Sequence, residues 1–342
     1  MNKLFKYIIF TMLFICAGCS TQSIKIGHEP KSNKESRSIF SQSDNVVAAK
    51  SLWIIKGGLK GEAGLYTGTK AADIKSLSLD ISIVEFLASV KVALTYSQVQ
   101  SEKELAFRYP AFIGLLARDF QMKIGDRKFR AVISGKESAE EIYQLAKSRG
   151  FNAVVVSQKA FGEMIVNASL KEKSDIEILF SYTQLSSLLG KERVLAFPKF
   201  HGLENADFKI DISGRFLSTL VSLTGLKKKV KGNKFFENIT DKEVIKDGLL
   251  IKYELRSLHA ISSDKKKMIK WNSNTNSYYS LPVGNVEMYS LCKAEIIKPA
   301  FSYLRLKEMV SQDKSFKEIE EHTIKSKLLT PISRLLLIDT SR

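Results

Sequence analysis

Histidine, cysteine and acidic side chains are the residues of this 342-residue chain that could carry catalysis or hold a metal. No two of its histidines stand four positions apart, the spacing that lets one helix bind zinc. The sequence also has no Gly-x-Ser-x-Gly element and no phosphate-binding glycine loop. We therefore expect a protein that is not an enzyme and needs no cofactor or metal, although a hydrolase triad assembled from distant residues stays open as an alternative. The four histidines are His28, His201, His259 and His322.

The strongest candidate for chemistry is Cys19, as a site of lipid attachment. Lys3 and Lys6 give the chain a positive start, residues 7–16 form an apolar run, and small residues follow, which is the layout of a secretory signal. The run is shorter than the ~18 apolar residues that a membrane-spanning helix needs. Its ending, Cys16-Ala-Gly-Cys19, is similar to the box of bacterial lipoproteins, although Cys16 stands where Leu, Val or Ile is usual. An ordinary signal peptide with an incidental cysteine is the alternative.

The lipoprotein resemblance implies that residues 1–18 are removed and that Cys19 holds the protein to a membrane through its lipid. Ser20, in place of a retaining aspartate, points to the outer membrane of the cell envelope. Residues 19–46 are polar and have almost no apolar pattern, so we expect a flexible tether. After cleavage and lipidation Cys292 is the one remaining thiol, so an intramolecular disulfide is excluded. We expect the Cys292 thiol to be buried and inert.

The chain is strongly basic. It has 53 Lys and Arg against 36 Asp and Glu, for a formal net charge of +17. This excess favours anionic partners, and for an exported protein nucleic acid is the poorest fit. We expect an envelope protein or an anionic polymer as the partner. The densest lysine clusters, which we interpret as solvated loop tips, are residues 227–229 with 231 and 234, and residues 265–267 with 270.

From Leu77 onward apolar and polar residues alternate in short segments, as expected of half-buried β-strands. Turn residues separate these segments, so the pattern predicts a mainly β fold, a sandwich with one short inserted helix. Ser138 and Glu141 form an expected capping box at the start of that helix, and Gly150 an expected left-handed cap at its end. The alternating positions begin at residues 77, 90, 105, 120, 176, 208 and 249.

Residues from about 75 to 200 resemble a VIT domain, the module named for vault proteins and inter-α-trypsin inhibitor heavy chains. The resemblance implies a β fold and brings no catalytic residues with it. It rests on an ordered set of landmarks: Phe107-Arg-Tyr-Pro110-Ala, Phe120 to Arg127, Ala139, Tyr143, Ala146 and Gly150, then Phe161, Ile165, Asn167, Ile178, Phe180, Tyr182 and Phe197-Pro198.

In many VIT proteins a von Willebrand A domain follows, which binds a metal through Asp-x-Ser-x-Ser. Asp211-Ile-Ser213 resembles the start of that motif, but Arg215 replaces the second serine and would put a cation where a metal wants oxygen. We therefore expect this A domain to be missing and interpret Asp211 and Ser213 as turn and strand-edge residues. A metal-dependent adhesion module at this degenerate motif remains the alternative.

The tail carries a helical pattern followed by Thr330-Pro-Ile-Ser333 and an apolar strand, which resembles the region after the A domain in such proteins. We expect that strand to return to the β body. The predicted organisation is a signal peptide at 1–18, a tether at 19–46, a VIT-like β domain at 47–200, a second β region packed on it at 201–297, and a helix with a terminal strand at 298–342. The predicted function is that of an envelope lipoprotein whose VIT-like domain binds a protein or polymer without catalysis.

Overall fold

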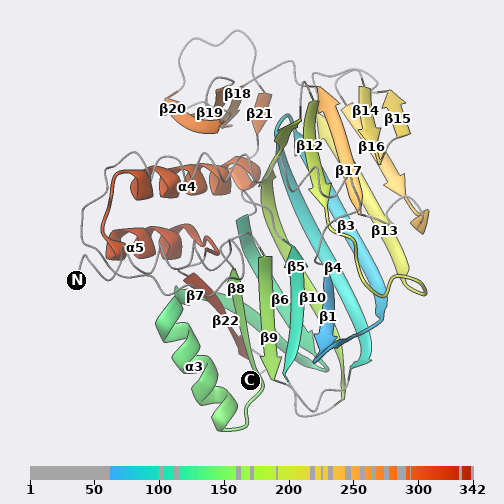
Figure 1. The fold of residues 1–342 in the computed structure, drawn as a ribbon, viewed down its shortest axis with the longest axis vertical. Coiled ribbons are helices and arrows are strands. Elements are labelled where there is room, and N and C mark those ends of the chain that lie inside the picture. Colours follow the sequence, from blue (N-terminus) through green and yellow to red (C-terminus); the bar gives the residue numbers. More distant parts are fainter. Residues whose placement is uncertain are drawn as a thin grey trace, which may run out of the picture.

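The computed structural model describes most of the chain after residue 61 (Figure 1). Cys19, the signal segment and the tether lie outside the described residues. The described ranges are 62–99, 104–110, 116–158, 163–169, 173–189, 192–215, 220–224, 226–229, 234–242, 248–254, 259–262, 267–272, 277–282, 290–292, 294–330 and 333–339.

One large sheet dominates the described part, as the alternating pattern predicted. All its neighbouring strands are antiparallel except β3 and β13, which run parallel. From edge to edge its thirteen strands are β16 (Lys234–Ile239), β13 (Asp207–Arg215), β3 (Ile74–Val84), β4 (Leu87–Val99), β10 (Ser174–Leu185), β6 (Leu116–Ile124), β7 (Arg127–Gly135), β22 (Ser333–Asp339), β8 (Ala153–Gln158), β9 (Glu163–Ser169), β5 (Leu105–Pro110), β1 (Gly64–Thr67) and β2 (Lys70–Ala71).

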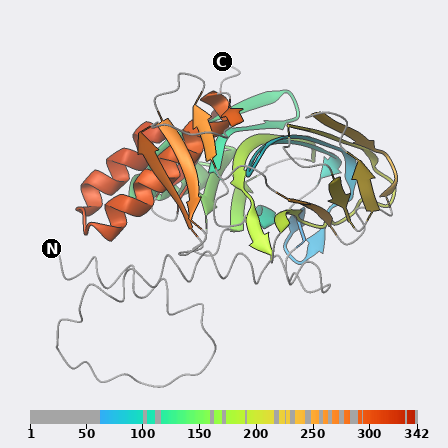
Figure 2. The same cartoon turned by 90° about the horizontal axis from the view of Figure 1, so that it is seen from above.

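The sheet curls, as the view from above shows (Figure 2), so that one face becomes the inside of the molecule. Buried and exposed residues alternate along a strand because successive side chains point to opposite faces of the sheet. On β3, Leu77, Leu79 and Ile81 are buried, whereas Ser78 and Asp80 are exposed. A second sheet closes the same core with Leu195, Phe197, Ile251 and Tyr253. Its strands are, in order, β11 (Ser187–Leu189), β12 (Glu192–Phe197), β17 (Leu249–Glu254), β14 (Leu220–Leu223) and β15 (Leu226–Lys229).

The C-terminal strand β22 lies in the middle of the large sheet, which confirms that the tail returns to the β body. It pairs with β7 over seven residues and with β8 over four, and separates these two strands completely. Its Leu335 and Leu337, 2% and 4% exposed, join the main core. Leu336 points the other way and packs against the cluster under helix α3. Both faces of β22 are therefore covered, which explains its unbroken apolar run.

Helix α3 (Lys136–Ser148) is the predicted inserted helix, and its end was predicted correctly. Gly150 has φ +71° and the amide of Phe151 donates to the carbonyl of Ala146 at 3.0 Å, which is a Schellman cap. The predicted capping box at its start is wrong. The N-cap is Gly135, with no side-chain cap bond, because β7 stays extended up to Gly135, where it pairs with Ser333. Ser138 and Glu141 therefore lie within the helix.

Two further helices form the tail, α4 (Ala294–Ser311) and α5 (Phe316–Ser326), and they lie side by side (Figure 1). Ser315 and Glu318 make a capping box at the start of α5, a signal that the sequence carries as Ser-x-x-Glu. Next to α4 lies a small sheet of β20 (Ser277–Pro282), β19 (Lys267–Asn272), β18 (His259–Ser262) and β21 (Ser290–Cys292). No helix in the described part of the chain combines the length and apolar character needed to cross a bilayer.

The hairpin turn between β3 and β4 joins the large sheet to these additions. Its two residues, Glu85 and Phe86, are 1% and 0% exposed, although turns usually lie at the surface. Phe86 packs with Ile297 and Ala300 of α4, and the backbone carbonyl of Glu85 accepts a 2.5 Å hydrogen bond from the hydroxyl of Tyr253 in β17. The turn thus connects the large sheet, the second sheet and helix α4.

The interpretation of the lysine clusters as loop tips is wrong for their described residues. Lys227, Lys228 and Lys229 lie in β15, the terminal strand of the second sheet, and Lys267 and Lys270 lie in β19.

Candidate binding surface

A cluster of charged and aromatic residues lies at the β1 edge of the large sheet. Its centre is the carboxylate of Glu62, which accepts from Lys199 Nζ at 2.8 Å through Oε1 and contacts His201 Nδ1 at 2.7 Å through Oε2. The hydroxyl of Tyr66 donates to the backbone carbonyl of Glu62 at 3.2 Å. The guanidinium of Arg108 lies over the Tyr66 ring, 5.6 Å from its centroid. We call these five residues the edge cluster.

The electrostatics of the edge cluster follow from this geometry. The hydrogen bond from Lys199 is the main cause that holds the pKa of the Glu62 carboxyl below its ordinary value. Partial burial of the carboxyl acts in the opposite direction, and the hydrogen bond with His201 lowers the pKa further. Burial, followed by the nearby Glu62 charge, raises the pKa of the Tyr66 phenol, so this hydroxyl stays a donor at neutral pH. Lys199 and His201 bind the Glu62 carboxylate, Arg108 lies over the neighbouring Tyr66 ring, and all three basic side chains are exposed. The charge of a second carboxylate, Glu163, also acts on Tyr66. The surface suits contact with an anionic group.

Backbone contacts between two distant segments position the cluster. The amide of Ala63 donates to the carbonyl of Lys199 at 2.8 Å, and the amide of His201 donates to the carbonyl of Ala63 at 2.9 Å. Gly202 then turns the chain with φ +77°, and a Cβ there would come within 3.0 Å of the backbone of Ala72 and Asp73. Glu62 and His201 are 139 residues apart, so no local sequence signal could have found the cluster. Sequence reasoning named only His201 of its members.

Behind this edge the core is rich in aromatic side chains, and one polar contact stands among them. The hydroxyls of Tyr109 and Tyr182 lie 2.6 Å apart, with one donating to the other, and both residues are buried. Burial raises the pKa of both phenols. Tyr109 also contacts Phe180 and Phe200. The pair has no access to solvent and is therefore a structural feature rather than a reactive one.

The degenerate metal motif lies inside a strand, and the prediction of a turn there is wrong. Asp211 and Ser213 are in β13, which is paired on both sides, with β3 and with β16. The Asp211 carboxylate accepts from Lys209 Nζ at 2.7 Å and from Asn238 Nδ2 at 2.7 Å, and these bonds lower its pKa. Within the described ranges no three His, Cys, Asp or Glu side chains come together in a way that could hold a metal ion.

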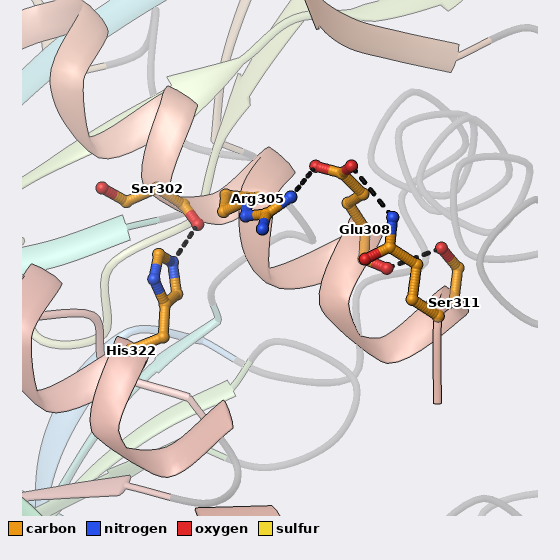
Figure 3. Close-up of polar contacts among 6 residues, drawn as sticks. Ser302, Arg305, Glu308, Ser311 and His322 are labelled. Atoms are coloured by element: carbon orange, nitrogen blue, oxygen red, sulfur yellow. Dashed lines mark hydrogen bonds and ion pairs between the residues drawn. The ribbon is translucent and has the colours of Figure 1, made fainter. Parts of the chain in front are cut away.

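Of the other predicted residues, His322 has a clear structural position. Its Nε2 donates to the backbone carbonyl of Ser302 at 2.9 Å and so ties α5 to α4 (Figure 3). Figure 3 also shows the end of α4, where Glu308 accepts from Arg305 at 2.6 Å. His259 lies in β18 and Cys292 in β21. Cys19 and His28 lie outside the described residues.

The architecture is that of a module built on a large curled β-sheet, with helices packed against its outer face and one end. A family model, the vault protein inter-alpha-trypsin domain, matches residues 74–182, so the chain contains a VIT domain, as the sequence landmarks indicated. The matched span runs from β3 into β10. Strands β1 and β2 precede it and β13, β16 and β22 follow it, and yet all five lie in the same sheet.

The comparison with curated protein sequences gives no match. The comparison with solved structures gives remote matches. A structure described as that of a nutrient binding protein from Legionella pneumophila has a TM-score of 0.32 and 9% identity over 56% of this chain and 70% of its own. Yeast LTA4 hydrolase has a TM-score of 0.27 and 10% identity over 54% of this chain and 29% of its own. Legionella pneumophila aminopeptidase A has a TM-score of 0.30 and 9% identity over 64% of this chain and 25% of its own. At these scores the likenesses carry no argument about function.

Proposed function

We propose that this protein is a lipid-anchored, non-catalytic binding module of the cell envelope, held at the outer membrane through Cys19. The VIT domain supplies a rigid β body, and the edge cluster supplies a surface on which an envelope protein or an anionic polymer binds. The observation that carries the proposal is the grouping of exposed Arg108, Lys199 and His201 beside Glu62 and Tyr66. The formal net charge of +17, which falls to +15 when Lys3 and Lys6 are removed with the signal segment, supports an anionic partner.

The metal-dependent alternative has less support, because the Asp211 carboxylate is engaged by Lys209 and Asn238. The hydrolase alternative also has less support, because the His201 ring contacts the Glu62 carboxylate, a pairing that by itself supplies a base and no nucleophile.

The anchor is tested by mass spectrometry of the mature N-terminus and by membrane fractionation in the native cell. We expect a lipid-modified Cys19 as the first residue, and a soluble protein for Cys19→Ala. Cys16→Leu is the matched control, because it changes the neighbouring cysteine and should leave the protein anchored. A Cys19→Ala protein that stays in the membrane would show that the leader, and not a lipid, is the anchor.

The binding surface is tested by capture of envelope proteins and polymers on the purified protein. We expect Arg108→Ala with Lys199→Ala to lose most of a partner that the wild type retains. Lys91→Ala is the control, because Lys91 is an exposed lysine in an ion pair with Asp80 on the outer face of the sheet. Equal capture by all variants would place binding elsewhere, and no capture by the wild type would contradict the proposed function itself.

A further inference from the structure

Helix α3 carries an apolar flank that no described element covers. Six large apolar side chains are exposed in the described part of the chain, and four of them lie on or beside this helix. Ile142 and Leu145 are on α3, and Phe151 follows its Schellman cap, which brings it to the last turn of the helix. Val132 is on β7, beside Leu336, which packs under α3. Their exposed fractions are 48%, 50%, 56% and 50%.

The packing of α3 shows which flank this is. Ala139, Tyr143 and Ala146 face the sheet. The hydroxyl of Tyr143 and the Nζ of Lys147 both bind the carboxylate of Glu104, the residue before β5. These two contacts hold one side of the helix against the sheet. At about 100° per residue, Ile142, Leu145 and Arg149 fall within about 60° of one another on the opposite side. In Figure 1 the helix lies at the margin of the molecule.

The charges along α3 are arranged so that the flank is complementary to itself. After Lys136 at its first position, the helix is acidic in its first half, with Glu137, Glu140 and Glu141, and it is basic at its end, with Lys147 and Arg149. When two copies of such a helix meet antiparallel, the acidic half of each faces the basic end of the other. With Ile142 opposite Leu145 of the second copy, Arg149 lies opposite position 138, next to Glu137 and Glu141.

We infer that the α3 flank is an interface with a second copy of this chain, formed by antiparallel pairing of the two α3 helices about a two-fold axis. The apolar centre is Ile142 and Leu145, extended by Val132 and Phe151, and Glu141 of each copy pairs with Arg149 of the other. The interface is small, so the association is weak and depends on concentration. This inference is independent of the edge cluster and of the proposed partner.

The test is the protein mass of the full-length chain by light scattering after size exclusion, over a range of concentrations. The protein is taken in detergent from membranes or from the soluble fraction, whichever holds it, so the outcome does not depend on the anchor. We expect the mass to rise from one chain toward two. Leu145→Lys should stay at one chain at every concentration. Phe236→Lys should behave as wild type, because Phe236 is 70% exposed on β16, six strands away from β7.

Charge reversal separates this interface from any other apolar contact. Glu141→Arg and Arg149→Glu should each raise the dissociation constant about ten-fold, because the symmetry breaks two ion pairs at once. The double variant should recover most of the wild-type association. Thermal melts check that each variant is folded. A wild type that stays a single chain, association that survives Leu145→Lys, or a double variant no better than the single ones would each overturn the inference.

Discussion

Strands from outside the family-matched span complete the VIT sheet in its middle and at both edges, and two of these segments, β22 in the middle and β1 at one edge, differ in the surface that they leave exposed. In the middle, β22 contributes Leu335 and Leu337 to the core and is paired along both sides. At the edge, β1 pairs with β5, and Ala63 and Leu65 are buried in the same core. Two backbone bonds and the contacts of Glu62 with Lys199 and His201 tie this segment to the turn at residue 201. Apolar burial therefore stabilises both segments, and the edge differs in that it also carries charged groups that stay exposed.

The largest effect is expected in the middle of the sheet. Leu337→Ala should lower the free energy of unfolding by about 2–5 kcal/mol, because it removes a buried side chain from a strand that is paired with a neighbour on each side. Urea denaturation measures the change. Leu179→Ala is the control, since Leu179 is 44% exposed on the outer face of β10 and should change stability by less than about 0.5 kcal/mol. Equal effects of the two would contradict a buried central β22.

The turn that leads into β22 should give the next largest effect. The hydroxyl of Ser333 donates to the carbonyl of Leu328 at 2.8 Å and accepts from the amide of Thr330 at 3.0 Å, with Ser333 fully buried. Ser333→Ala leaves both groups without this partner and should cost about 1–3 kcal/mol. Exposed Ser148, which bonds the carbonyl of Leu145 on α3, is the matched serine for comparison. Its replacement by Ala should give a melting temperature near wild type.

The buried Tyr109–Tyr182 pair links β5, next to the edge strand β1, with β10, and for it we expect a non-additive result. Tyr109→Phe or Tyr182→Phe alone leaves one buried hydroxyl without its partner and should cost about 1 kcal/mol or more. The double variant should be closer to wild type than the sum of the two, because no orphan hydroxyl remains. Strict additivity in a double-mutant cycle would show that the two hydroxyls do not interact.

The smallest effect is expected at the edge, and it should depend on pH. The pKa of Glu62 is lowered from its ordinary 4.5, so its contribution to stability is fully present above that value and is lost as pH falls through the lowered pKa. Because the cluster is largely exposed, Glu62→Gln should cost less than about 1 kcal/mol at pH 7. The difference from wild type should vanish in acid. A difference that stays constant as the pH falls through the acid range would assign the effect to packing and not to charge.

The sequence predicted most of the strands because alternation is a local signal. Residues 77 to 83 and 176 to 182 needed only their own pattern to reveal strands and buried faces. The same holds for the end of α3 at Gly150. The start of α3 was missed because β22, almost 200 residues later, keeps β7 extended up to Gly135. A Cβ at Gly135 would also collide with the carboxylate of Glu320 in α5, a contact that no local pattern reveals.

The candidate surface was much less accessible to sequence reasoning. His201 was named for its residue type alone, and its partner Glu62 belongs to a segment with no motif of its own. Asp211 and Ser213 had a motif but lie within a paired strand, where the Asp211 carboxylate bonds Lys209 and Asn238. Residue spacing predicted local conformation in this chain, whereas the grouping of side chains on the surface depended on which distant strands pair.

The central claim is that β22 belongs to the same cooperative unit as the VIT strands beside it. Native-state hydrogen exchange of the full-length protein tests this most directly, by comparing the amides of β7, β8 and β22. We predict that all three strands exchange with the same free energy, close to that of global unfolding, because β22 separates β7 from β8 and bonds to both. If the β22 amides exchange at a markedly lower free energy while β7 and β8 stay protected, the C-terminal strand is an accessory and the account is wrong.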